Sequence, residues 1–90
     1  MNKKPPAIET VGPDLFKRMV EAGAVLGVVV AAHGDGFNVV IHIGSNKRPL
    51  ATFRGNVRTF KSIQTVLSYL HESGIGRFEV DISRYVPKAR

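Results

Sequence analysis

VLGVVVAAHGDGFNVVIHI, residues 25–43, decides the fold of this chain. Residues 25–32 are rich in β-branched side chains and apolar on both alternating faces, a pattern typical of a strand that is covered on both sides. Glycines and an aspartate predict a turn over residues 33–36, and residues 37–43 alternate in the manner of a second strand. The stretch therefore predicts a β-hairpin whose first strand is central in its sheet.

A helix before the hairpin and a third strand after it are predicted next. The N-terminus of the helix is predicted at Gly12, Pro13 and Asp14. Proline is tolerated in the first turn because no hydrogen bond is lost there, and an acidic side chain is favourable near the positive end of the helix dipole. A glycine at position 23 is a suitable stop. Residues 44–47 form a turn into an antiparallel strand over 48–53, whose proline indicates a strand start or a sheet edge.

Residues 57–75 predict a second helix, capped by Thr59 or Ser62 and ended by Gly74. Apolar residues at helical spacing form a stripe that should lie on the sheet. These residues are Phe60, Ile63, Val66, Leu67 and Leu70. Residues 77–82 alternate apolar and charged side chains, which predicts a last strand beside either neighbour.

The predicted fold class is α+β: a single small domain in the order helix, three-stranded antiparallel meander, helix and strand, with the helices packed on a largely antiparallel sheet. Its expected parts are a flexible basic arm over residues 1–11, the domain over 12–85 and a frayed basic tail over 86–90. A chain of 90 residues buries a modest share of its surface, so self-association into a homodimer is expected.

The composition restricts compartment and chemistry. There is no cysteine, which excludes disulfides and thiolate metal sites and is compatible with a reducing compartment. The opening MNKKPPAIET has no apolar signal-peptide core, and the longest apolar run, residues 24–32, is too short to span a bilayer. We therefore expect a cytoplasmic protein with no membrane partner.

Positive charge is concentrated in the middle of the chain. Thirteen Lys and Arg against seven Asp and Glu give a net charge of +6, and no acid stands between Asp35 and Glu72. Such a window attracts polyanions, nucleic acid first, although a charge of this size also serves plain solubility. The candidate nucleic-acid-binding residues are Lys47, Arg48, Arg54, Arg58 and Lys61.

Aromatic residues are interleaved with these cations, a constellation typical of nucleic-acid binding. The spacing of Phe53 and Phe60 in the predicted strand and helix nevertheless favours a core position for both. The loop from Arg54 to Ser62 then leads into a helix whose first turn offers free backbone N–H groups, which suit a phosphate.

No pattern of catalysis stands out. The three histidines, His33, His42 and His71, lack metal-ligand spacing, and Glu79 and Asp81 on one strand face are more typical of surface ion pairs. No nucleophile elbow or phosphate-binding loop is present. We therefore predict no catalytic residues, no cofactor and no metal, and a small hydrolase or transferase has only the isolated histidines in its favour.

Three stretches carry a resemblance: GPDLFKRMVEAGAV from residue 12, RPLATFRGNVRTF from residue 48 and TVLSYLHESGIGRFEVDISRY from residue 65. They resemble the small ParC family of plasmid partition-associated proteins, which is unrelated to the topoisomerase subunit of the same name. The similarity covers about residues 7–85. Gln64 departs from it, because an acidic residue tends to stand there in the family.

This resemblance implies a bacterial, plasmid-encoded accessory protein that acts near a partition NTPase and a centromere-binding protein, and it brings no catalytic residues. The leading hypothesis is a non-enzymatic accessory protein that binds DNA phosphates through its basic face. The alternative is a homodimeric protein-interaction adaptor for partition proteins, with no direct nucleic-acid binding, whose apolar strand over residues 25–32 awaits a partner.

Overall fold

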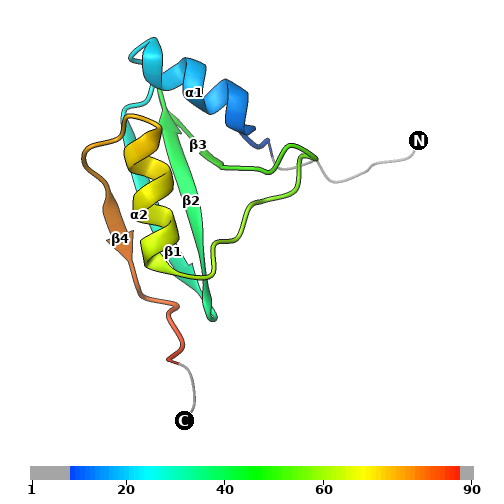
Figure 1. The fold of residues 1–90 in the computed structure, drawn as a ribbon, viewed down its shortest axis with the longest axis vertical. Helices are drawn as coiled ribbons and strands as arrows, with labels where there is room; N and C mark the ends of the chain where they lie inside the picture. The colour runs from blue at the N-terminus through cyan, green and yellow to red at the C-terminus, as the bar shows by residue number, and fades with distance from the viewer. Residues whose placement is uncertain (1–8, 88–90) are drawn as a thin grey trace.

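The computed structural model describes residues 9–87, and Figure 1 shows their arrangement. Its elements follow the predicted order, and the α+β class is confirmed. They are α1 (Pro13–Glu21), β1 (Gly27–His33), β2 (Gly36–Ile43), β3 (Asn46–Pro49), α2 (Ile63–Glu72) and β4 (Glu79–Asp81). Neither helix in the described part of the chain is long and apolar enough to cross a membrane.

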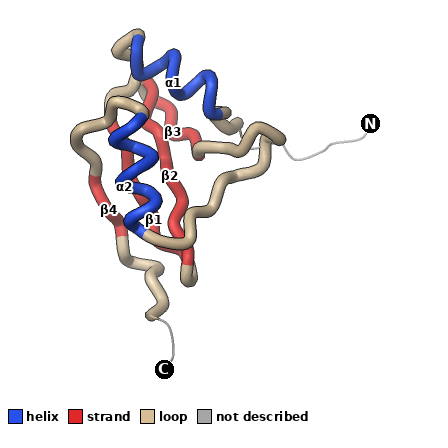
Figure 2. The backbone as a smooth tube through the Cα atoms, in the orientation of Figure 1, coloured by secondary structure: helices blue, strands red, loops and turns tan. Residues whose placement is uncertain are grey.

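The four strands form one mixed sheet in the order β3-β2-β1-β4. The meander β1-β2-β3 is antiparallel, and β4 adds to β1 in parallel, which the crossover through α2 permits. The inner place of β1 confirms that this strand is central. Figure 2 shows α2 lying lengthwise over the sheet and α1 near one end of it.

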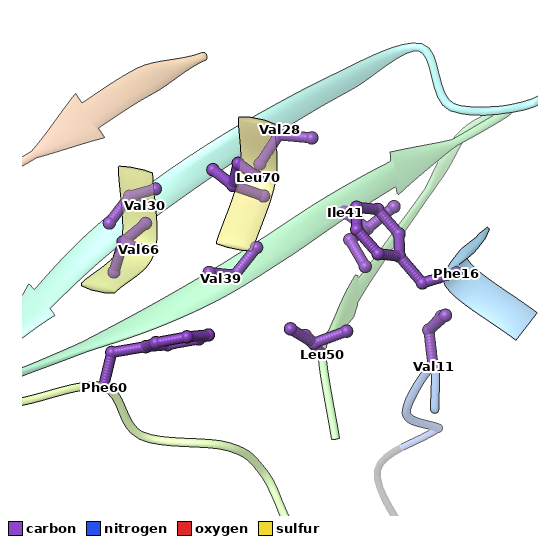
Figure 3. Close-up of a cluster of buried hydrophobic side chains, with 10 residues drawn as sticks. All are labelled: Val11, Phe16, Val28, Val30, Val39, Ile41, Leu50, Phe60, Val66 and Leu70. Carbon is purple, nitrogen blue, oxygen red and sulfur yellow. The ribbon is translucent and has the colours of Figure 1, made fainter. Parts of the chain in front are cut away.

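Both helices pack on the same face of the sheet, here called the covered face. Phe16 of α1 and Leu70 of α2 are fully buried there with Val39 of β2, and Figure 3 shows how these side chains converge. The cluster consists of Val11, Phe16, Val28, Val30, Val39, Ile41, Leu50, Phe60, Val66 and Leu70. Burying these side chains supplies most of the driving force for folding.

The opposite face of the sheet, here called the open face, carries no helix in the described part of the chain. Burial therefore alternates along β1, with Val28 and Val30 buried and Val29 and Ala31 half-buried. The prediction that this strand is covered on both sides is wrong. Both helices cover one face, and residues 9–87 contain no further helix for the other.

The second helix is shorter than its apolar stripe suggested. Ser62 is its N-cap, and the Ser62 hydroxyl accepts a hydrogen bond from the Thr65 backbone N–H at 3.2 Å. Val66 is fully buried as predicted, whereas Leu67 is 48% exposed. Leu67 lies at the edge of the apolar stripe, on the side of α2 that is exposed to solvent, although its neighbours Val66 and Leu70 are buried.

The third strand lies earlier than the predicted range 48–53. It covers Asn46–Pro49 at the sheet edge, in agreement with the edge position that its proline indicated. Leu50 continues as an isolated bridge with Val11, and the chain then leaves the sheet. In Figures 1 and 2 the following loop projects beyond the β3 edge.

The domain begins earlier in the chain than predicted. Val11 is fully buried, and its backbone N–H donates to the Pro49 carbonyl at 2.9 Å, so this residue belongs to the domain and not to the arm. At the other end the Val86 N–H donates to the Gly34 carbonyl at 3.1 Å, which ties the start of the predicted tail to the hairpin turn. Residues 1–8 and 88–90 of the predicted arm and tail lie outside the described residues.

Candidate nucleic-acid interface

Three of the five candidate cations stand on residues 51–62, which join β3 to α2 and are here called the connecting segment. Its first half is a small loop, closed by a hydrogen bond from the Thr52 N–H to the Asn56 carbonyl at 2.8 Å. Its second half returns to the sheet, where the backbones of Phe60 and Phe37 exchange two hydrogen bonds of 2.8 Å. The segment is therefore anchored at both ends and displays what lies between.

Arg58 is held in a defined position by aromatic rings. Its guanidinium carbon lies 4.3 Å from the ring centroid of Phe60 and 4.9 Å from that of Tyr69. Stacking uses the flat face of a guanidinium and leaves the in-plane N–H donors at its edge. Within residues 9–87 no salt bridge or side-chain hydrogen bond engages those donors. The site is therefore a pre-oriented cation with its donors available to an anion.

Of the two rings that support Arg58, Phe60 belongs to the buried core and Tyr69 is half-buried against it. Phe60 and Tyr69 pack at 5.6 Å between centroids, and Phe16 stacks on Tyr69 at 6.1 Å with an interplanar angle of 16°. Burial raises the pKa of Tyr69 above its usual range, an effect that the positive charge of Arg58 opposes. The phenol is therefore neutral at neutral pH and does not neutralise the arginine. Asn38 fixes the backbone here, because its amide donates to the Arg58 carbonyl at 2.9 Å.

Phe53 is 81% exposed, so its predicted core position is wrong. It stands beside exposed Arg54 in the loop of the connecting segment, and it lines a hollow of about 310 Å³ together with Leu15 and Arg18 of α1. The sequence did hold a signal for this. The turn-forming Gly-Asn pair directly after Arg54 marks a loop, and the glycine has the positive φ of 91° that such a turn requires.

Lys47 and Arg48 point to opposite faces of the sheet. Arg48 pairs with Ile41 and so lies on the covered side, where its Nη2 is 2.7 Å from Oε1 of Glu9. Lys47 pairs with His42 and lies on the open face. The structure therefore separates these two candidates from each other, and Arg48 already has an acidic partner.

Lys61 is exposed directly before the N-cap of α2. Arg54, Arg58 and Lys61 thus stand along the connecting segment, from its first loop to the start of α2, whereas Lys47 lies elsewhere. The role of all five residues in binding stays a prediction. The arrangement itself is chemically simple: cations and one exposed aromatic ring, with no acid in the segment.

The histidines remain apart in the structure. His33 and His71 are exposed near the ends of β1 and α2, and His42 is half-buried on the open face. Among residues 9–87 no three histidine or acidic side chains gather in a way that would hold a metal ion. The site therefore offers charge and stacking as its chemistry.

Comparison with known proteins gives one match. No curated protein and no solved structure is detectably similar to the chain. The family model described as ParC-like matches residues 11–89, which include every helix and strand of the fold and the whole connecting segment. Because this match spans nearly all of the chain, the resemblance seen in the sequence is confirmed, and the protein belongs to the ParC-like family.

Proposed function

We propose that this protein is a non-enzymatic accessory protein of plasmid partition that binds nucleic acid, DNA first, through the connecting segment. The observation that carries the proposal is Arg58, whose guanidinium rests on two rings and whose donors have no partner within residues 9–87. A guanidinium positioned in advance loses little conformational freedom when it binds a phosphate, and its fork of N–H donors matches phosphate oxygens.

The neighbours of Arg58 fit the same ligand. Arg54 and Lys61 are exposed on the same segment and add phosphate contacts. Phe53 supplies an exposed ring, and stacking of a base on such a ring is favourable for any base. Contacts of these two kinds carry little sequence information, so we expect binding that is salt-sensitive and largely independent of sequence.

The test is fluorescence anisotropy of a labelled random-sequence duplex, titrated with the protein at two salt concentrations. Arg58→Ala should weaken binding by about tenfold, on the scale of one charge-assisted contact. It should also reduce the slope of log K against log salt by about one. Arg58→Lys keeps the charge but loses the stacked fork, and we expect it to recover only part of the affinity.

Arg77→Ala is the matched control, because it removes one exposed arginine outside the connecting segment. It should leave both affinity and salt slope nearly unchanged. Absence of binding at low salt would overturn the proposal, and so would an equal loss in the Arg58 and Arg77 variants. The same titration with a single-stranded probe shows whether Phe53 stacks on bases. If it does, Phe53→Ala should weaken binding to the single strand more than binding to the duplex.

A second function, an adaptor that binds partition proteins and no nucleic acid, is favoured by the half-buried apolar residues of the open face. Its test is the mass, by light scattering, of mixtures with the purified partition NTPase and centromere-binding protein of the same plasmid. A complex with either protein that Val29→Glu abolishes would support the adaptor. Unchanged masses in both mixtures would contradict it.

A further inference from the structure

The open face has the properties of an interface rather than of a solvated surface. Two adjoining hollows, of about 780 and 510 Å³, lie along it and share Ala31 and Val40 in their lining. Val29 and Pro49 extend this apolar floor across β1 and β3. Half-buried aliphatic residues in the middle of a sheet face are typical of surfaces that pack against another layer.

Charge is distributed unequally across this face. Lys47 stands at the β3 edge, whereas Glu79 and Asp81 stand at the β4 edge. The Ser83 N–H donates to Asp81 Oδ1 at 2.9 Å, and this hydrogen bond lowers the pKa of the carboxyl, so the acidic edge is charged at neutral pH. Arg84, which follows β4, lines the smaller hollow beside Asp81, so the acidic edge is confined to the larger hollow, where Glu79 and Asp81 have no arginine among the lining residues.

Nucleic acid does not fit the open face. Its two carboxylates offset the charges of Lys47 and Arg84, so the face has no excess of positive charge for phosphates, and the residues that line the hollows include no Phe or Tyr on which a base would stack. At the larger hollow the face calls for a partner with an apolar centre, one acidic edge and one basic edge. A second copy of this chain has that pattern.

We propose that the protein forms a homodimer by packing the open faces of two copies together, about a two-fold axis that runs along the strands. The strand order β3-β2-β1-β4 decides the axis, because a two-fold axis in this direction places β3 of each copy over β4 of the other and β2 over β1. Val40 then meets Val29 of the second copy, and the Lys47 edge meets the Glu79 edge twice. A two-fold axis across the strands would instead bring like edges together.

Register supports this pairing of edges. Val40 and Val29 are directly paired, and Glu79 is paired with Val29, so these residues form one row across the sheet. Lys47 belongs to the next row, about 7 Å along the strands, a distance that a lysine side chain spans. The central residues Val29, Ala31 and Val40 are small or aliphatic, which lets two sheets approach to about 10 Å there, with His42 and Asn38 at either side of Val40 along β2.

The area of the open face limits the expected affinity of the dimer. Four strands about 4.8 Å apart, two of them roughly 25 Å long and two of them roughly 10 Å long, cover on the order of 350 Å² in each copy. The two copies together would bury about 700 Å², which is below the usual size of stable specific interfaces, so we expect a weak, transient dimer with a dissociation constant on the order of 10 µM or higher, and a folded monomer at high dilution.

Sedimentation equilibrium of the purified full-length chain, without nucleic acid, tests the interface independently of the proposed function. Over roughly 1 µM to 1 mM the wild type should pass from monomer to dimer. Val40→Glu should weaken association by at least about a hundredfold, because a charge would be buried without a partner. The matched control is Leu67→Glu, which adds the same charge at an exposed aliphatic residue of α2 and should leave association unchanged.

Charge reversal tests the axis itself. Lys47→Glu and Glu79→Lys should each weaken the dimer by about five- to tenfold, because each creates like-charge pairs at two symmetric places. The double variant restores the unlike pairs with reversed sign and should return to within about twofold of the wild type. Thermal unfolding by circular dichroism confirms that each variant is folded. A strictly monomeric wild type, or a double variant no stronger than the single ones, would overturn the proposal.

Discussion

The covered and open faces of the same sheet differ in how completely they are filled. Val39 and Val40 are adjacent in β2, yet Val39 is fully buried under the helices and Val40 is half-buried on the open face. On the covered face apolar side chains from both helices and the connecting segment interlock with the strands. The same residue type thus supports folding on one side of the strand, and on the other side it is available to a partner.

This comparison also explains where the cations are useful. The covered side provides the rings of Phe60 and Tyr69, and these orient Arg58 at the edge of the core. The hollows of the open face contain no Phe or Tyr ring, and their cations Lys47 and Arg84 are accompanied by carboxylates. A rigid core next to the connecting segment therefore favours anion binding there, whereas the mixed charges of the open face favour a complementary protein surface.

The largest expected difference between the faces is in the free energy of unfolding. Val39→Ala should lower it by about 2–3 kcal/mol, because two buried methyl groups are lost and a cavity remains. Val40→Ala should lower it by less than about 1 kcal/mol at a concentration where the protein is monomeric. Urea unfolding of both variants measures the difference. Equal losses would show that the open face is as tightly packed as the covered one.

Two strand glycines provide a second comparison of similar design. A Cβ on Gly36 would lie 2.7 Å from Thr59 Cγ2 and 3.2 Å from the Phe60 carbonyl oxygen, so Gly36→Ala should destabilise the protein by about 1–2 kcal/mol. A Cβ on Gly27 would be 3.9 Å from the Cβ of His42, an ordinary contact. Gly27→Ala should therefore be neutral or slightly stabilising, since alanine restricts the unfolded chain.

Thermal unfolding of the two alanine variants gives the sign of each effect. A destabilising Gly27→Ala substitution would mean that the open face is closer to its neighbours than the structure indicates. A neutral Gly36→Ala substitution would mean that the backbone at Thr59 and Phe60 can move to make room for the new methyl group. It would contradict a rigid placement of Arg58 by the connecting segment.

The smallest expected effect is on pH dependence. Burial raises the pKa of Tyr69 above 10.0, so the folded state holds the phenol proton more tightly than the unfolded chain does. The stability linked to this group is present below about pH 10 and is lost as the pH rises through the folded pKa. Tyrosinate absorbance in a Tyr85→Phe background follows Tyr69 alone, because the chain has two tyrosines.

Removal of the positive charge of Arg58 should shift the titration of Tyr69. Arg58→Ala is expected to raise the pKa of Tyr69 further, because the positive charge that opposes the effect of burial is gone. Arg77→Ala should not move it. An unchanged titration in the Arg58 variant would contradict the close approach of its guanidinium to the ring.

Much of the fold followed from local pattern. Alternating and helical spacing predicted the hairpin, the two helices and the last strand, and Ser62 was one of the two caps considered. The errors occur where an element ends. Pro49 stands at the end of β3 rather than at its start, and Phe53 lies in a loop because the Gly-Asn pair after Arg54 turns the chain.

The candidate site was predictable as charge but not as geometry. The lack of acidic residues between Asp35 and Glu72 pointed to Arg54, Arg58 and Lys61, since the charge of a segment can be read directly from its sequence. That Arg58 stacks on Tyr69, eleven residues later, depends on how α2 crosses the sheet. Likewise, the separation of Lys47 from Arg48 follows from strand register, which pairing with β2 decides.

The class of the fold, the order of its elements and the excess of positive charge are predictable from the sequence, because they depend on local spacing and composition. That both helices share one face and leave the other open depends on how the elements pack in three dimensions. An apolar strand carries the same signal whether its second face meets a helix or another molecule, since burial favours both in the same way. Local spacing therefore predicts that β1 is apolar on both faces, and only the packing of the helices decides which of these faces the described part of the chain covers.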